Sequence, residues 1–156
     1  MKRLLMIAVI TLAAGLAGIA SALLVAGSAL AQGLPNPTMQ EILVKTSLLT
    51  FNDANVTGNY TVLHAKLSKP FRDQASPEKL KQAFKAFADQ RIDFDLIAAK
   101  PIVPTSEAQI NNNGVLMLRG YFDTTPSRVT YELDFLLSEG EWKLADINVR
   151  VKPPGQ

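Results

Sequence analysis

Three stretches near the C-terminus decide the fold: VLMLRGYF at residues 115–122, RVTYELDFLL at 128–137 and EWKLADINVRV at 141–151. In the middle stretch apolar residues take the odd positions and polar residues take most even positions, which is typical of a strand with one buried face. Short turn-forming sequences separate the stretches. The pattern therefore predicts three consecutive antiparallel strands.

The turn between the second and third stretches sets their register. A two-residue turn at 139–140 places Leu137 opposite Trp142, an apolar pair on the core face. Farther along the third stretch, the apolar residues move from even to odd numbers. Such a phase shift requires one extra residue, so we expect a β-bulge near 145–146 and a bend of the sheet there.

The other face of the predicted sheet mixes apolar and charged residues. Pairing residue 122 with residue 129 places Arg119 opposite Glu132 on this face, and we expect the two to form an ion pair. The apolar residues beside them are Val115, Met117, Tyr121 and Leu136. This composition predicts a weak or moderate homodimer through the outer sheet face, with a solvated monomer as the alternative.

Three helices are expected before the sheet. Thr38 opens a capping box that predicts a first helix, ending at Gly58. A second, shorter helix follows Asn59. A third starts after Ser76 and ends near residue 90.

The segment between the third helix and the strands has a weaker pattern. Residues 96–103 are apolar, but Pro101 and Pro104 lack the amide donor that a sheet requires. We therefore expect an edge strand or a strand broken in two. Residues 111–114, Asn-Asn-Asn-Gly, predict a turn.

The N-terminus has the pattern of an export signal. Lys2 and Arg3 precede 28 residues without a charge, which close on the triplet Ala-Leu-Ala. We expect residues 1–31 to be a signal peptide cleaved before Gln32, so that the mature chain is periplasmic or secreted. At about 1.5 Å per residue the stretch could also span a bilayer. An uncleaved anchor, with membrane contact through it, therefore stays open.

The remainder fits a short leader at 32–37, one domain at 38–152 and a tail at 153–156. Because Lys2 and Arg3 are the only charges of the N-terminal segment, the rest holds 14 basic and 14 acidic residues. No basic cluster could follow a phosphate backbone, which argues against nucleic acid as a partner. The chain has no Cys, which excludes disulfides and thiolate chemistry. We expect no cofactor.

Helices followed by a bent antiparallel sheet form the plan of an α+β cone, in which the three N-terminal helices cover the concave face of the sheet. Residues 142–149, with their phase shift, resemble the last strand of the nuclear transport factor 2-like superfamily. Residues 52–62 and 120–129 are similar to an exported bacterial group of that superfamily. The resemblance covers most of 38–152 and implies the cone. It implies no single function, because the superfamily includes enzymes, binders and scaffolds.

Few residues are candidates for a site. His64, the only histidine, has no second ligand at metal spacing, so we expect a structural role and no metal. Tyr60 and Tyr131 should line the cone with His64, and their hydroxyl groups could contact a ligand. Asp93 and Asp95 lie where the sheet begins and are expected as solvated acids of a turn.

Two functions stay open. The first is a non-catalytic binding or interaction domain whose cone holds a small apolar ligand. The second is a small isomerase or lyase that uses His64 with Tyr60 or Asp95. The pattern places no carboxylate inside the cone, where proton abstraction next to a carbonyl requires one, so we favour the first and assign no catalytic residue. A filled apolar cone would exclude the second, and an acid or histidine in a cavity would favour it.

Overall fold

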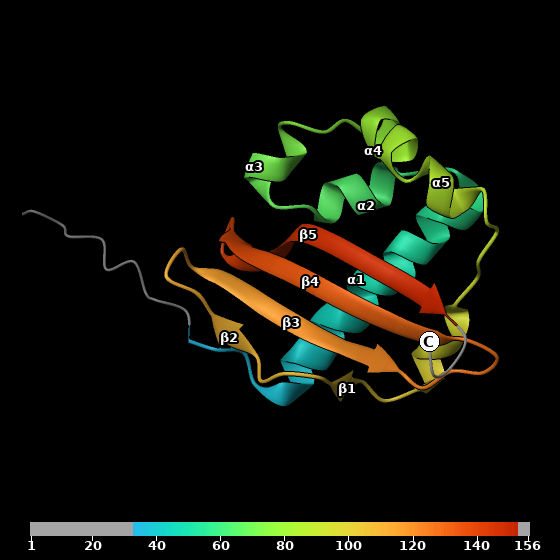
Figure 1. Ribbon diagram of the computed structural model, residues 1–156. Helices are drawn as coiled ribbons and strands as arrows, with labels where there is room; N and C mark the ends of the chain where they lie inside the picture. Colours follow the sequence, from blue (N-terminus) through green and yellow to red (C-terminus); the bar gives the residue numbers. More distant parts are fainter. Residues whose placement is uncertain (1–32, 153–156) are drawn as a thin grey trace, which may run out of the picture. The chain divides into compact units, whose positions relative to one another are not determined.

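The computed structural model describes residues 33–152, in which helices pack against one face of a five-stranded antiparallel sheet (Figure 1). The expected signal segment at 1–31 and the tail at 153–156 lie outside these residues. Within the described range, no helix has the length and apolar character needed to cross a membrane.

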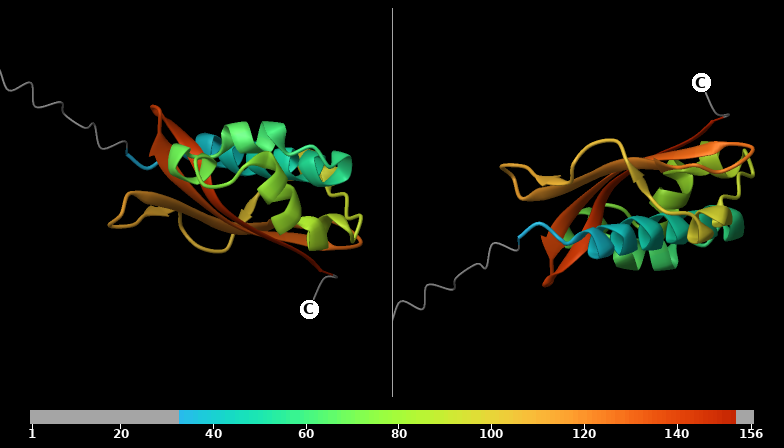
Figure 2. Two further views of the ribbon diagram at one scale, coloured as in Figure 1. Left: turned by 90° about the horizontal axis from the view of Figure 1, so that it is seen from above. Right: turned by 90° about the horizontal axis from the view of Figure 1, so that it is seen from below.

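Three long strands form most of the sheet, as expected: β3 (Val115–Phe122), β4 (Arg128–Ser138) and β5 (Glu141–Lys152). They are antiparallel neighbours in that order. Two short strands, β1 (Val103–Pro104) and β2 (Gln109–Ile110), both pair with β3 and form the opposite edge from β5. Figure 2 shows the strong twist of the long strands.

The predicted register is confirmed. Phe122 pairs with Val129, and Leu137 pairs with Trp142. At the turn, residues 139 and 140 both have positive φ angles, as a two-residue hairpin turn requires. The partner of Asp134 is residue 146 and that of the next residue is 144, so Ala145 has no partner and forms the expected bulge.

Two details of the sheet differ from expectation. Arg119 lies opposite Glu132 as expected but forms no ion pair with it, because the Arg119 side chain reaches the diagonal neighbour Asp134, with 2.5 Å between Nη2 and Oδ1. Glu132 instead pairs with Arg150 at 3.2 Å. Leu137, expected on the buried face, is 42% exposed, since the burial pattern of β4 loses its alternation near the turn.

The first helix, α1 (Pro37–Thr57), begins earlier than expected. Its cap is Asn36 and not Thr38: the Asn36 side chain accepts a hydrogen bond from the Met39 amide at 2.8 Å. Asn36 caps the helix in place of Thr38 because the next residue is Pro37, which suits the first helical position and needs no partner for an amide. Gly58 ends the helix in the left-handed conformation, as predicted.

The expected third helix is divided into two shorter elements, and a short helix that was not predicted follows the expected second helix. The described residues contain α2 (Thr61–Lys66), α3 (Lys69–Arg72), α4 (Pro77–Ala83) and α5 (Lys85–Ala88). Ser76 caps α4 as predicted, and its hydroxyl accepts a bond from the Lys79 amide. The third helix is interrupted at Phe84, whose ring packs edge-on against Phe51 at 4.9 Å.

The expected strand at 96–103 is largely absent. Its first part is a 3-10 helix, η1 (Asp95–Ala99), and only the two residues of β1 join the sheet. Just before this segment the chain is bonded to α1, where the Asn52 side chain accepts a hydrogen bond from the Phe94 amide at 3.1 Å. The Asn-rich turn at 111–114 forms as predicted, with Gly114 at a φ of 74°.

The core lies between α1, the shorter helices and the sheet. Buried residues come from the helices and from the inward face of each long strand. The largest fully buried side chains include Phe51, Leu48, Leu63, Ile97, Leu116, Phe122, Tyr131, Leu133 and Phe135. The described domain therefore has a complete apolar core of its own.

Candidate functional site

Tyr60 lies just before α2 and is only 2% exposed. Its hydroxyl donates a hydrogen bond to Oδ1 of Asn55 at 2.7 Å, and its ring lies parallel to that of Phe84. Burial raises the pKa of Tyr60 above its ordinary value. The hydroxyl thus has a protein partner, and the ring is packed against the protein.

Tyr131 lies on the inward face of β4 and is also 2% exposed. Its neighbour across the strands is Gly120, and a Cβ there would lie 2.5 Å from the Tyr131 hydroxyl oxygen. Glycine is therefore required to make room for the phenol. Burial, with a smaller effect from the negative charge of Glu41, raises the pKa of Tyr131 to about 12. Tyr131 is a core residue.

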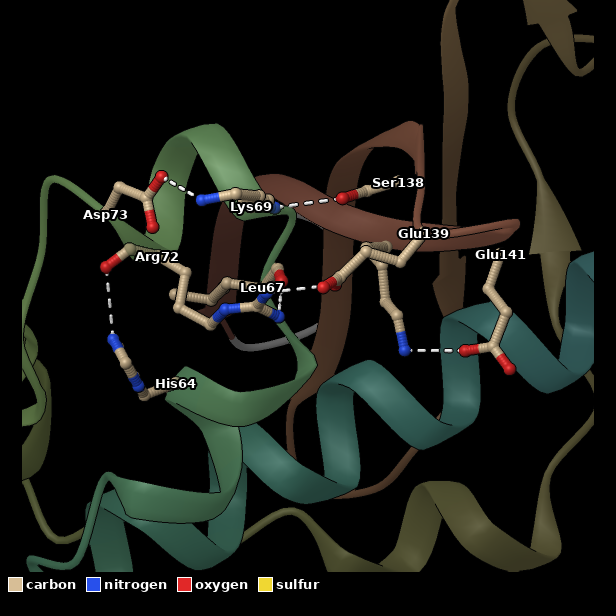
Figure 3. Close-up of polar contacts among 9 residues, drawn as sticks. His64, Leu67, Lys69, Arg72, Asp73, Ser138, Glu139 and Glu141 are labelled. Carbon is tan, nitrogen blue, oxygen red and sulfur yellow. Dashed lines mark hydrogen bonds and ion pairs between the residues drawn. The ribbon is translucent and has the colours of Figure 1, made fainter.

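His64 belongs to a polar cluster that joins α2 and α3 to the turn between β4 and β5 (Figure 3). Its Nε2 lies 3.2 Å from the carbonyl oxygen of Arg72. The Arg72 guanidinium in turn donates to the carbonyl of Leu67 at 3.2 Å and to the Glu139 carboxylate at 2.9 Å. The contacts give His64 and Arg72 a role in holding the helices to the hairpin.

The three predicted ligand residues are therefore not gathered at one site. Tyr60 and His64 are one helical turn apart, but their polar atoms bind different partners. Tyr131 is packed inside the core. The described residues contain no group of three His, Cys, Asp or Glu that could hold a metal ion.

Asp93 and Asp95, the other candidates, are exposed and lie at the start of η1. The Asn52 side-chain amide donates to both carboxylates, at 3.0 and 2.8 Å. Bonds from the Asp95 amide and from Asn52 lower the pKa of Asp93. Both acids thus fix the turn, as expected from the sequence.

Sequence reasoning missed Asn52, which is 1% exposed and makes all three bonds to residues 93–95. The only available signal was its position beside Phe51 in the first helix, where the apolar face should be. A polar side chain there must find partners inside the protein.

A groove lies on the surface above Tyr60, between the end of α1 and the helices α4 and α5. We name it the Tyr60 groove. Its volume is about 480 Å³. Its lining consists of Gly58, Tyr60, Glu78, Lys81, Gln82, Lys85, Ala88 and Asp89.

The charges of the Tyr60 groove balance. Lys85 binds both carboxylate oxygens of Asp89, at 2.8 and 2.6 Å. The Nζ of Lys81 lies next to Gly58 at the C-terminal end of α1, where free carbonyl groups favour a cation. Hydrogen bonds from its own amide and from Ser76 lower the pKa of Glu78. With two cations and two anions, the lining has no net charge.

Two further hollows continue from the Tyr60 groove. Ala88 also borders a cavity of about 320 Å³, which extends past Arg91 to Asp93. Ile92 and Asp93 in turn border a cavity of about 240 Å³ beneath the loop between β3 and β4. A fourth cavity, of about 590 Å³, lies apart from these at the start of α1 and the loop 104–108. None of the four is lined by His64 or Tyr131.

Comparison of the chain with family models, with curated proteins and with solved structures finds no match.

Proposed function

We propose that this chain is an exported, non-catalytic binding domain with the three-helix cone plan of the nuclear transport factor 2-like superfamily. Its ligand is small, largely apolar and uncharged, and binds in the Tyr60 groove. The ligand site thus lies outside the packed interior and retains one of the predicted residues, Tyr60. Export rests on the uncharged stretch that follows Lys2 and Arg3.

One observation carries the proposal: a groove of about 480 Å³ that is lined by Tyr60 and by residues of α4 and α5. Sites for small molecules usually measure about 300 to 1,000 Å³ and combine apolar walls with a few polar groups. Ala88 and the alkyl stems of Lys81 and Lys85 supply most of the apolar surface, with the buried Tyr60 beneath them. Because the charged groups of the lining balance, an uncharged ligand fits it better than an ion.

The absence of catalysis is proposed from the partners of the candidate residues. Tyr60, His64 and Asp95 each form a hydrogen bond with a group of the protein itself. The two acids of the groove offer no base: Glu78 has a lowered pKa and Asp89 is paired with a lysine. A general base poised near neutral pH needs the opposite arrangement, with a raised carboxyl pKa.

A fluorescence titration tests the proposal. Phenylnaphthylamine, an uncharged apolar probe, should bind the exported chain at one saturable site, with a rise and blue shift of its emission. Ala88→Phe fills the groove and should abolish this signal. A probe that binds without saturation, or equally well to Ala88→Phe, would overturn the proposal.

Ala86→Phe is the matched control. Ala86 lies in the same helix as Ala88, is exposed and does not line the groove. It should bind the probe like the parent chain. Loss of binding in both variants would mean that the added ring disturbs α5 as a whole, and the site would then not be the groove.

The homodimer through the outer sheet face stays a prediction. Val115, Met117 and Leu136 form its apolar part, and each is partly buried within one chain. Met117→Glu should dissociate such a dimer in sedimentation equilibrium.

A further inference from the structure

The two edges of the sheet differ in what covers them. On one side β3 pairs with β1 and β2. On the other side, beyond its pairing with β4, β5 has among the described residues only a bridge between Leu144 and Leu67 (Figure 1). From Asp146 to Lys152 the strand therefore has an open edge, a place where a further strand can add.

One existing bond shows which backbone groups point outward. The carbonyl of Leu144 points away from β4, because it accepts a hydrogen bond from the Ser68 amide at 2.8 Å. Along a strand, the backbone N–H and C=O groups of successive residues point alternately toward one neighbouring strand and away from it. The extra residue at Ala145 shifts this alternation by one residue. The residues whose N–H and C=O groups point away from β4 are hence Ile147, Val149 and Val151.

Two charges at the ends of this edge lie opposite like charges. The direct neighbour of Asp146 on β4 is Asp134, and that of Lys152 is Arg128. Asp134 and Arg128 each form an ion pair elsewhere, whereas Asp146 and Lys152 form none with the residues that the structure describes. Like charges directly opposite are destabilising. The edge thus has one uncompensated charge of each sign.

We infer that β5 pairs antiparallel with the β5 strand of a second copy of this chain, about a two-fold axis at Val149, and that this edge rather than the outer sheet face forms the dimer. Residues 146 and 152 are equally distant from 149, so Asp146 of each copy comes to lie opposite Lys152 of the other. Val149 lies opposite itself, and Ile147 lies opposite Val151. These are the residues whose backbone groups point outward, so each pair exchanges two hydrogen bonds.

Burial and charge both favour a second copy of the chain at the β5 edge. The side chains of Ile147, Val149 and Val151 face the helices but are only partly buried, so the helical layer does not seal this edge. Edges protected against pairing often use lysines, which repel a second copy. Here the opposite signs of Asp146 and Lys152 make the edge complementary to itself in the antiparallel direction.

A charge exchange tests the register. The full chain is expressed, recovered from the compartment to which it is delivered and examined by sedimentation equilibrium. Asp146→Lys and Lys152→Asp should each raise the dimer dissociation constant about tenfold or more, because each creates two like-charge contacts per dimer. The double exchange should restore association to near the parent value. A parent chain that stays monomeric at ~1 mM, or a double exchange no better than the singles, would overturn the inference.

Cysteine cross-linking tests the axis independently. The chain has no cysteine, so Val149→Cys introduces a single thiol. Directly opposed residues of a hydrogen-bonded pair lie about 5.5 Å apart at Cα, within the range of a disulfide. Val149→Cys should form a covalent dimer on mild oxidation, whereas Met117→Cys, on the outer face, should not. Cross-linking through Met117→Cys alone would place the second copy on the outer face and contradict the edge.

Discussion

The helix α1 and the segment from α2 to α5 cover the same sheet in different ways. α1 is one helix of 21 residues with eight buried side chains. The other four helices have four to seven residues each, and only Leu63 and Leu80 among them are buried. A continuous helix can fill the space above a sheet, whereas short helices held by single residues leave hollows between them. Stability should therefore depend on α1, and binding on α4 and α5.

The largest effect is expected at Phe51, which connects the two regions. It is 2% exposed and contacts the rings of Phe84, Phe87 and Phe94 at 4.9 to 6.4 Å. Phe51→Ala should lower the free energy of unfolding by about 3 to 5 kcal/mol, because it removes a buried ring and leaves a cavity. Urea denaturation measures this. A loss below about 1 kcal/mol would mean that α1 is not the main support of the core.

Gly120→Ala tests how tightly the core is packed around Tyr131. The added Cβ would lie 2.5 Å from the Tyr131 oxygen and 2.6 Å from the carbonyl oxygen of Val103. We expect a loss of about 1 to 3 kcal/mol, since the core must expand or the pairing with β1 must shift. Tyr131→Phe in the same chain removes the hydroxyl and should recover part of the loss. If Gly120→Ala has the same free energy of unfolding as the parent, the core around Tyr131 has space for the added methyl group, and the packing described here is wrong.

At high pH, the stability of the fold should depend on the buried phenol of Tyr131. The pKa of Tyr131 is raised from about 10 to about 12 in the folded state. The folded chain therefore keeps a proton that the unfolded chain releases. The corresponding stability is complete below pH 10 and is lost as the pH rises toward 12. As the pH rises from about 10 toward about 12, the unfolding free energy should therefore fall more steeply for the parent chain than for Tyr131→Phe. Equal slopes would mean that water reaches the phenol.

The smallest effect is expected in the Tyr60 groove. Lys81→Gln keeps the first part of the alkyl stem and removes a positive charge from the lining of the groove. Its unfolding free energy should stay within about 0.5 kcal/mol of the parent value, as is usual for surface substitutions. Thermal unfolding of the two chains checks this. A larger loss would show that the charge beside Gly58 supports the end of α1.

The sheet was largely predictable from the sequence because its signals are local. The alternation of β4, the turn at 139–140 and the phase shift at Ala145 fix the register without reference to the helices. The helical region was predicted less well, since its boundaries depend on contacts between distant residues. The third helix is interrupted at Phe84, whose ring packs against Phe51. The segment after residue 92 is hydrogen-bonded to Asn52 of α1.

The candidate site, too, was predictable only where its signals are local. Burial of Tyr60 and Tyr131 agrees with their expected place among the core-lining aromatic residues. The Tyr60 groove was not predicted, because it depends on how short helices end and on the direction of side chains such as Lys81 and Lys85. Helical periodicity identifies which face is buried, but it does not identify a hollow between two elements.

One measurement tests the central claim that the interior is filled and that the ligand binds beside α4 and α5. Amide chemical shifts of the isotope-labelled chain are recorded while phenylnaphthylamine is added. We expect saturable shifts at residues 58–60 and 78–89, with little change at 48–51 and 131–135. Shifts concentrated in α1 and β4, without change around Tyr60, would contradict the account and place the ligand inside the cone.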